Sequence, residues 1–307
     1  MKKIGYQAAA LGLVLALAAW LVWNALDNLA ARGIASGFGF LSREAGFEIG
    51  ESPLLAYTAA DTYLRALAVG LLNTARVSVV GLVLATLLGT AAGLALLAGH
   101  PLVRGLARAY VEFVRNTPLL VQLFFWYALI TDALPAPRSA LAPLPGVFLS
   151  NRGIELPLPG SVPALNGFNF SGGAHLSPEL AALLAGLVLY TGAFIAEIVR
   201  AGILSVRRDQ VDAALALGLG RADTLRHVVA PQALRLVVPP YTSQVLNLVK
   251  NSSLAVAIGY PDLVAVANTA INQTGQAIEG IALIMAAYLT VSLVLSGLLN
   301  GYNARLR

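Results

Sequence analysis

The sequence predicts an all-α integral membrane protein with six membrane-spanning helices. The first observation is composition: 58% of the residues are hydrophobic and 11% are charged, whereas soluble domains carry roughly 25% charged residues. The second is that the hydrophobic residues are gathered in six long runs almost free of charge. A helix needs about 20 such residues to cross a bilayer, so we expect membrane lipid to be the main solvent of this chain.

The first run is uncharged over residues 4–26, which is 23 residues. This length spans a bilayer core of about 30 Å and exceeds the apolar region of a signal peptide. The triplet Ala-Leu-Ala at residues 16–18 resembles a cleavage site, so a cleaved signal is the alternative to an anchor helix. We expect an uncleaved anchor, and assign residues 1–64 to it and to a first outer segment.

The five further runs lie at residues 77–99, 116–131, 180–196, 236–249 and 280–304. The runs that begin at 116 and 236 are shorter than the usual span of about 17 to 25 residues. Their helices must therefore extend through a charged residue that lies near an interface or faces protein. Residues 65–305 are expected to form one transmembrane domain.

Basic residues are distributed unequally between the two sides of the predicted spans. With the N-terminus inside, 13 Lys and Arg lie on the inner side and 5 on the outer side. An excess of these residues marks the cytoplasmic side, so both termini are expected to be cytoplasmic. The inner residues are Lys2, Lys3, Arg104, Arg108, Arg115, Arg200, Arg207, Arg208, Arg221, Arg226, Arg235, Arg305 and Arg307, and the outer ones are Arg32, Arg43, Arg65, Arg138 and Arg152.

Two long outer segments connect the predicted spans. Residues 135–177 contain seven prolines and six glycines in 43 residues, so this insert is expected to be extended, not helical. A segment of this length is long for a simple connection, and both a spacer and a role at the outer face stay open. Residues 27–62 are rich in Gly and Phe and are expected to form an interfacial loop or a short amphipathic piece.

Several kinds of site are absent from the sequence. It contains no Cys, and its three His residues have no ligand spacing, so no metal site is expected. No segment clusters His, Asp, Glu or Ser at catalytic spacing, which predicts no enzyme activity. Basic residues stand singly, which argues against nucleic-acid binding. None of the three lysines follows a glycine, so there is no phosphate-binding P-loop, and any ATP must be bound by a partner.

The inner loop at residues 200–235 shows helical spacing broken by charges and glycines, which predicts two short helices. Asp209 and Asp223 are the expected N-caps, because a carboxylate can accept backbone N–H bonds there. Gly218 and Gly220 are expected to supply the turn between the helices.

This loop carries a motif at characteristic spacing, consisting of Asp212, Ala213, Ala214, Gly218, Val228 and Pro231. The motif resembles the EAA loop of bacterial ABC-importer permeases, with Asp212 in place of the usual Glu and Ala230 in place of Leu. The flanking segments 196–203 and 248–254, together with 115–122, are similar to the polar amino-acid subclass.

The resemblance implies a five-helix type I ABC-importer permease core, preceded by one additional N-terminal helix as in the larger general or acidic amino-acid permeases. It implies a multi-pass protein of the bacterial inner membrane with a periplasmic insert at 135–177 and a cytoplasmic coupling loop at 200–235. The implied partners are a second permease in a heterodimer, two ATPase subunits that bind ATP and Mg, and a periplasmic amino-acid-binding protein. The motif residues would dock the ATPase.

Span five carries polar residues that favour a transport pathway. Gln244, Asn247 and Asn251 lie three and four residues apart, on one helical face. Such a face is costly in lipid, so it is expected to line the bundle interior or a wet cavity. The alternative is hydrogen bonding between helices, worth only about 0.6 to 2 kcal/mol per bond.

Charged residues near span ends predict ion pairs. Lys250 is expected to pair with a protein acid such as Glu197, or with a substrate carboxylate. Glu197 lies three residues before Arg200, which predicts a gating or structural pair. Glu112 and Arg115 have the same spacing and are expected to form a local pair.

Arg76 lies near the outer end of span two, where it is expected to extend to the lipid headgroups without a further role.

The resemblance implies an ATP-driven importer of polar L-amino acids, in which the missing P-loop leaves ATP binding to a partner. The alternative is a secondary transporter driven by an ion gradient, with Glu197 as its proton site.

Overall fold

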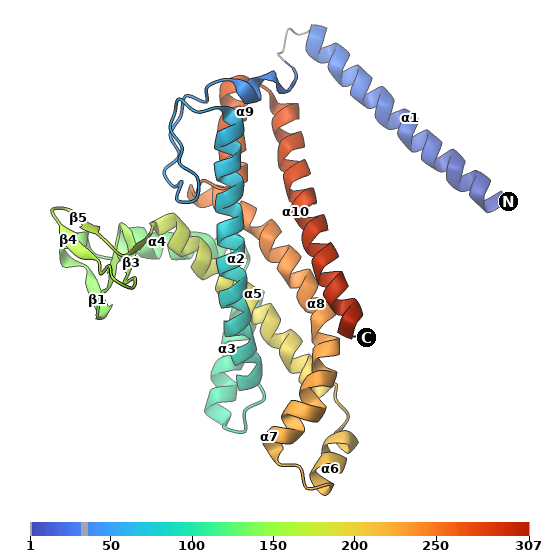
Figure 1. Ribbon diagram of the computed structural model, residues 1–307, viewed down its shortest axis with the longest axis vertical. Helices are drawn as coiled ribbons and strands as arrows, with labels where there is room; N and C mark the ends of the chain where they lie inside the picture. Colours follow the sequence, from blue (N-terminus) through green and yellow to red (C-terminus); the bar gives the residue numbers. More distant parts are fainter. Residues whose placement is uncertain (1, 32–35, 307) are drawn as a thin grey trace.

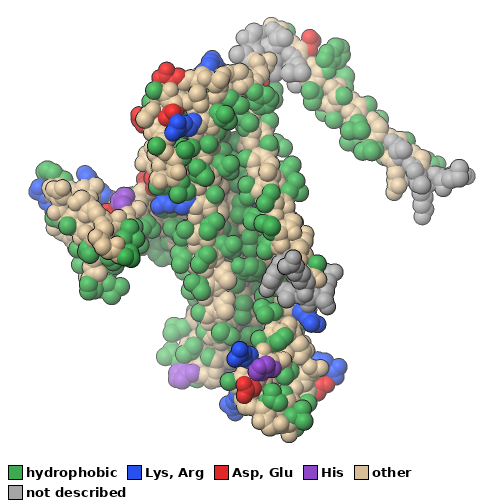
Figure 2. Space-filling model, in the orientation of Figure 1, with side chains coloured by type: hydrophobic (Ala, Val, Ile, Leu, Met, Phe, Trp, Pro, Cys, Tyr) green, Lys and Arg blue, Asp and Glu red, His purple; other side chains and the backbone are tan. Residues whose placement is uncertain are grey.

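The computed structural model describes residues 2–31 and 36–306. Figure 1 shows an elongated helical bundle, a small unit of strands at one side, and the helix α1 apart from both. Arg32 and Arg307, which were counted for the orientation, lie outside the described residues. Hydrophobic side chains cover most of the visible bundle between its ends, where many of the charged side chains gather (Figure 2).

The N-terminal helix α1 (Lys2–Ala31) makes no packing contact that buries its side chains: each one that the structure describes is exposed. Its stretch Gly5–Asn24 is apolar enough to cross a membrane. An exposed helix of this composition requires lipid or another subunit around it.

Four helices in the described part of the chain are long and apolar enough to cross a membrane, or up to six if two bent pairs each count as one span. The four are Gly5–Asn24, α2 (Tyr63–Ala95), α5 (Pro178–Leu204) and Ala277–Gly301 in α10 (Ala277–Leu306). One bent pair joins α3 (Pro101–Asn116) to residues 119–133. The other joins residues 221–258, which include α8 (Ala230–Asn251) and the 3-10 helix η5 (Ser252–Ile258), to α9 (Leu263–Thr274).

Pro118 separates α3 from α4 (Leu119–Ala128), which continues as the π-helix η2 (Leu129–Ala133). The residue before a proline is disfavoured in the helical region, and Thr117 is extended, with φ −102° and ψ 128°. The chain therefore bends by 106° between the two helices.

Close packing of α2 on α5 depends on glycine. A Cβ added at Gly89 would lie 2.6 Å from Ile195 Cβ, and one added at Gly93 would lie 2.7 Å from the Ala196 carbonyl oxygen. In a membrane the hydrophobic effect does not drive helices together, so their association depends on van der Waals packing. Small residues favour this packing because they let the helix backbones approach closely. The helices thus pack at a distance that larger side chains would prevent.

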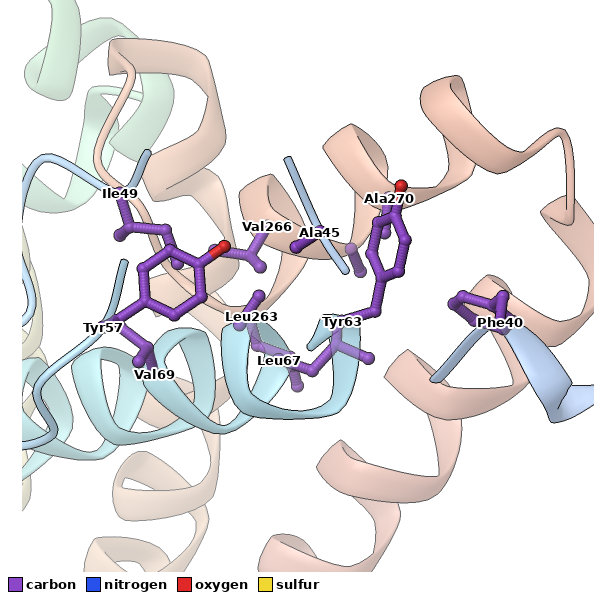
Figure 3. Packing of buried hydrophobic residues seen from close by; sticks show 12 residues of the cluster. Phe40, Ala45, Ile49, Tyr57, Tyr63, Leu67, Val69, Leu263, Val266 and Ala270 are labelled. Atoms are coloured by element: carbon purple, nitrogen blue, oxygen red, sulfur yellow. The ribbon is translucent and has the colours of Figure 1, made fainter. Parts of the chain in front are cut away.

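The outer segment before α2 is folded onto the bundle. Its 3-10 helix η1 (Phe38–Ser42) places Phe40 in a buried cluster with Tyr63 of α2 (Figure 3). Tyr57 of the same outer segment and Val266, which lies in α9, also belong to this cluster. Burial, followed by the nearby carboxylates, raises the pKa of Tyr57, whose hydroxyl donates to Phe47 O at 2.9 Å. In the segment predicted to be an interfacial loop, Phe40 and Phe47 pack on protein, whereas Phe38 is 53% exposed.

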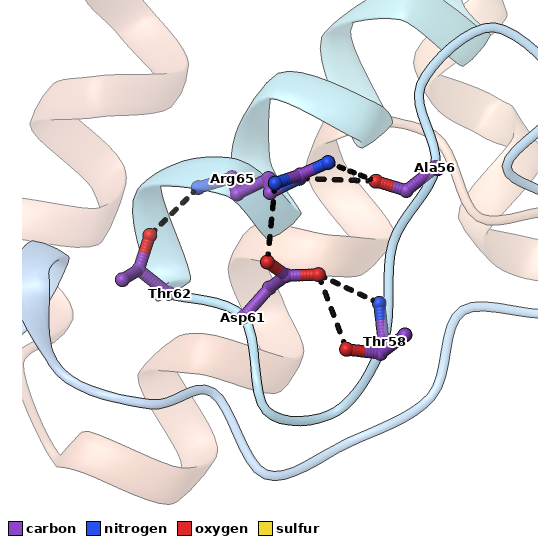
Figure 4. A network of polar contacts seen from close by, with 5 residues as sticks. All are labelled: Ala56, Thr58, Asp61, Thr62 and Arg65. Atoms are coloured by element: carbon purple, nitrogen blue, oxygen red, sulfur yellow. Dashed lines mark hydrogen bonds and ion pairs between the residues drawn. The ribbon is translucent and has the colours of Figure 1, made fainter.

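A polar network fixes the turn into α2 (Figure 4). Asp61 accepts from the Thr58 backbone at 2.8 Å and lies 3.3 Å from Arg65, whose guanidinium donates to the Ala56 carbonyl at 2.7 Å. Thr62 caps the helix by accepting from Arg65 N at 3.3 Å. These bonds position the outer segment relative to the first turn of α2.

The insert at 135–177 forms strands, so the prediction of an all-α chain is wrong for this segment. Its prolines and glycines break helices but supply turns, with φ of +77° at Gly146 and +64° at Gly167. Strands β1, β2, β3 and β6 pair antiparallel in that order, and β4 pairs with β5. The elements are η3 (Pro137–Ser139), β1 (Leu141–Leu144), β2 (Val147–Ser150), β3 (Gly153–Leu156), β4 (Ala164–Asn166), β5 (Asn169–Ser171) and β6 (Ala174–Leu176).

Candidate functional site

A cavity of about 430 Å³ lies between the C-terminal half of α5 and the first half of α8, beside the last residues of α3. Its lining includes Arg115, Phe194, Glu197, Pro240 and Gln244. The cavity therefore combines a cation, an anion, an aromatic ring and an amide, and its two charged side chains are 42% and 29% exposed.

Glu197 is at the centre of the charges in this cavity. Its Oε2 accepts from Arg200 Nε at 3.0 Å, and its Oε1 lies 4.0 Å from Arg115 Nη1. The Arg115 guanidinium also lies 5.0 Å from the centre of the Phe194 ring, within range of a cation–π contact. The contact between Glu197 and Arg200 is therefore present, and the charge on Glu197 is shared with a second arginine.

Two predicted pairs are wrong. Arg115 reaches Glu197 across the bundle, and no ion pair with Glu112 occurs in the described part of the chain. Lys250 is exposed and does not contact Glu197, because it lies toward the other end of α8. The first error comes from assigning a partner by sequence spacing, because the carboxylate nearest to Arg115 lies on another helix. The second comes from pairing two residues whose places along their helices a single sequence does not give.

The polar face of α8 continues from this cavity. Gln244 lines the cavity, while Asn247 and Lys250 are exposed and Asn251 is partly exposed. Among the described residues, none of these four side chains has a hydrogen-bond or ion-pair partner in the chain. The face is thus directed away from the chain's own bundle and is open to a ligand or another subunit.

The inner loop forms two short helices as predicted: α6 (Arg208–Ala216), and α7 (Arg221–Thr224), which continues through the π-helix η4 (Leu225–Val229) into α8. Gly218 has φ +85° and makes the turn between them, a conformation that favours glycine. Pro231 lies where the π-helix η4 passes into α8. A proline inside a continuous helix removes one backbone hydrogen bond, and a local π-helical turn is one way to accommodate that loss.

The predicted N-caps are wrong. α6 begins at Arg208, so Asp209 lies inside its first turn and bonds Arg207 at 2.6 Å. The N-cap residue of α7 is Gly220, so Asp223 also lies inside the helix. Both carboxylates still lie near the positive ends of helix dipoles, where they are stabilising.

A groove of about 410 Å³ runs along α6. Ala213, Ala214 and Val228 line it, together with Leu217, which is 81% exposed. Asp212 is exposed on the same helix. An exposed leucine beside small residues offers an apolar surface that another protein can approach closely.

Comparison with known proteins places these features in a family. The model of the "Binding-protein-dependent transport system inner membrane component" family matches residues 85–307. The chain belongs to this family. It is an ABC transporter permease of the amino-acid importer group.

Relatives of this permease match it over nearly the full length. It is 44% identical to the putative amino-acid ABC transporter permease protein YhdX of Escherichia coli (strain K12), over 98% of this chain and 93% of that one. It is 37% identical to the general L-amino acid transport system permease protein AapQ of Rhizobium johnstonii, over 99% and 92%.

A solved structure shares the fold of the permease. It is a chain of an amino acid ABC transporter crystallised with histidines, 26% identical, with a TM-score of 0.59 over 79% of this chain and 95% of that chain. A chain of the MetNI methionine ABC transporter, 14% identical with a TM-score of 0.56, also shows the same fold. The helical core is therefore that of type I ABC permeases.

A second polar cluster in the permease was missed by sequence reasoning. Arg76 Nη1 lies 3.0 Å from Glu51 Oε2, and the other oxygen of Glu51 accepts from the Ser177 hydroxyl. Asn73 donates to the carbonyls of Glu51 and Pro261 at 2.8 and 2.9 Å. The prediction that Arg76 only extends to headgroups is wrong. The spacing of Asn73 and Arg76 on one face of an apolar helix was the available signal.

Proposed function

We propose that this permease is the transmembrane subunit of an ATP-driven importer of polar L-amino acids. It would span the bacterial inner membrane six times, with both termini in the cytoplasm, an anchor within residues 1–64 and the transport domain in residues 65–305. The family membership and the amino-acid relatives support this proposal.

We infer the substrate class from the opposite charges in the cavity between α5 and α8. An amino acid has one carboxylate and one ammonium group, and Arg115 and Glu197 offer a matching cation and anion 4.0 Å apart. A substrate would insert between them and exchange this pair for two pairs of its own, with the Gln244 amide as a further hydrogen-bonding group. Arg200 would then hold Glu197 in position and act in gating.

The polar face of α8 is the proposed contact with a second permease. Asn247, Lys250 and Asn251 extend the pathway beyond the cavity, and unpaired polar groups are costly in lipid. A partner subunit that covers them would complete a pathway between the two permeases. We propose that this second permease is a different chain, so that the pair is a heterodimer.

The groove along α6 is the proposed docking surface for two ATPase subunits, one on each permease. These subunits would bind ATP and Mg, which this chain cannot cradle without a P-loop. A periplasmic amino-acid-binding protein would deliver substrate at the outer face, beside the insert at 135–177. Closure of the ATPases would move the docked loop and hence α5 and α8.

Purification of the complex through this subunit tests the proposal. Mass spectrometry should identify an ATPase, a second permease and a bound amino acid, and vesicles containing the complex should take up that amino acid only with ATP. Uptake that persists without the ATPase but stops with an uncoupler would support the ion-gradient alternative and overturn the proposal.

A pair of variants tests the cavity itself. Glu197→Gln should lower uptake by about tenfold, because the loss of a hydrogen bond to a charged group costs about 1.5 to 3 kcal/mol, and the 29% exposure of the Glu197 side chain keeps the effect near the lower end. Ser243→Ala, at an exposed position of α8 beside the cavity residue Gln244, is the control and should leave uptake unchanged. Equal uptake by the wild type and Glu197→Gln would exclude Glu197 from the pathway.

A further inference from the structure

A second cavity of about 530 Å³ lies between the inner halves of α2, α5, α8 and α10, apart from the proposed pathway. Its walls are hydrocarbon, with leucine, isoleucine, valine and alanine side chains from all four helices. Two of the few polar groups on the wall are already bonded to each other: Thr86 Oγ1 lies 2.8 Å from the Tyr241 hydroxyl. A ligand of this cavity must therefore be apolar.

The cavity is open to the surface of the bundle toward its inner end. Leu94, Leu225 and Leu234 line it and are 49%, 49% and 50% exposed. Leu94 lies in the last turn of α2, and Leu225 begins η4, so the opening is close to the level of the inner loop. A flexible chain can enter here from the surrounding lipid without crossing a polar layer.

Positive charge lies at the same end. Arg226 is one helical turn from Ala230, a lining residue, and is exposed; His227 beside it is also exposed. No ion pair of Arg226 occurs in the described part of the chain. Figure 2 shows Lys, Arg and His side chains gathered around this end of the bundle. A phospholipid has an apolar acyl chain and a negatively charged phosphate. A hydrocarbon cavity can hold the acyl chain, and a cation at its mouth can pair with the phosphate.

We propose that this cavity holds an acyl chain of a phospholipid from the inner leaflet, with the lipid phosphate at Arg226. The inference rests on the proposed function for its membrane orientation. The bound chain would fill the space between α2 and the helix that leads from η4 into α8, and so support the connection between the coupling loop and the transmembrane helices.

Photolabelling tests this site. The purified complex, reconstituted in vesicles that contain a phosphatidylglycerol with a photoreactive acyl chain, should give labelled peptides concentrated at the cavity walls. Ala233→Phe should reduce this labelling at least fivefold by filling the cavity. Arg226→Gln, at the surface, should reduce it at least threefold, and Arg208→Gln on α6 is the matched control that should leave it unchanged.

Label distributed evenly over all lipid-facing helices, or unchanged in both variants, would overturn the proposal. The absence of native cysteine allows a further arm: a disulfide between cysteines placed at Val14 of α1 and Leu299 of α10 would show that α1 occupies the cavity, and would also overturn it. The labelling does not require transport. Specific labelling without ATP-driven uptake would contradict the proposed function alone.

Discussion

The outer polar cluster and the polar face of α8 contain similar residue types and differ in where their partners lie. In the outer cluster Asn73, Arg76 and Glu51 satisfy one another within the chain, at distances of 2.8 to 3.0 Å. On α8 the side chains of Asn247 and Lys250 have no partner in the described part of the chain. Polar groups in apolar helices need partners. The first cluster therefore stabilises the fold of this chain, and the second face is available to bind another molecule.

The difference also shows which half of the permease is complete alone. The outer segment, α2 and α9 share a buried aromatic and aliphatic core in addition to their polar bonds. Other parts of the permease present a charged cavity, an uncovered polar face on α8 and a groove on α6. Substitutions in the outer segment, α2 and α9 should therefore lower stability, and those in the cavity, the polar face and the groove should lower assembly and transport.

The largest expected loss of stability comes from Arg76→Ala. It leaves Glu51 without its cation at a site where the two side chains are 26% and 18% exposed. Because this exposure lets water compensate in part, we expect a loss of about 2 kcal/mol, below the full penalty for a buried pair. Thermal unfolding of the purified complex measures it, with Arg152→Ala as a control at an exposed position. An unchanged midpoint would show that the outer cluster does not hold the fold.

Gly218→Val should have the next largest effect. A left-handed backbone costs a non-glycine residue roughly 1 to 2 kcal/mol, and Gly218 has φ +85°. The turn between α6 and α7 should shift and the ATPase should no longer co-purify, while the membrane-inserted subunit persists. Gly99→Val, at a glycine with no nearby atoms, is the control. A normal complex with normal uptake would contradict the assignment of the docking loop.

Asn247→Ala should change stability by less than about 0.5 kcal/mol, as at other exposed positions, yet reduce association with the second permease. Thermal unfolding of the isolated subunit measures the change in stability, and size-exclusion chromatography of the complex measures the association with the second permease. A large fall in thermal stability of the isolated subunit would show instead that Asn247 bonds within its own chain.

The smallest effect is expected for Asp61→Asn in the network of Figure 4. The pair with Arg65 is 3.3 Å long, and its side chains are 43% and 24% exposed. Such pairs contribute about 0.2 to 1 kcal/mol, so chemical denaturation should detect a small loss of stability. Added salt screens the pair and should make the difference between the wild type and the variant smaller. Uptake should be unchanged. A loss as large as that of Arg76→Ala would erase the ranking of the two networks.

Local signals in the sequence predicted much of the fold. Apolar runs indicated the membrane class, the prolines and glycines of 135–177 excluded a helix there, and Gly218 marked a turn that the structure confirms. The uncharged run at 77–99 did not show that α2 begins at Tyr63, because Arg65 and Arg76 lie in the first part of the helix and end the run. Their partners Ala56 and Glu51 lie in the segment before the helix.

The groups of the candidate cavity were predicted only in part. Glu197 and Arg200 share one helical face, so their contact could be inferred from spacing. Arg115 reaches Glu197 from another helix, and its position depends on the bend at Pro118 and on helix packing. Contacts between residues distant in sequence require the tertiary structure, which a single sequence does not supply.

The insert connects two helices that already pack on each other. Helices α4 and α5 share a buried cluster that includes Leu119, Leu123, Leu180 and Leu183. The two ends of the insert are therefore joined to helices that lie side by side. Most of its strands lie outside this core, with only Ile154 and Leu176 packed against it. Evolution can therefore lengthen, shorten or replace the insert without changing the order of the helices, and importers can diversify their outer surface while they retain one transport mechanism.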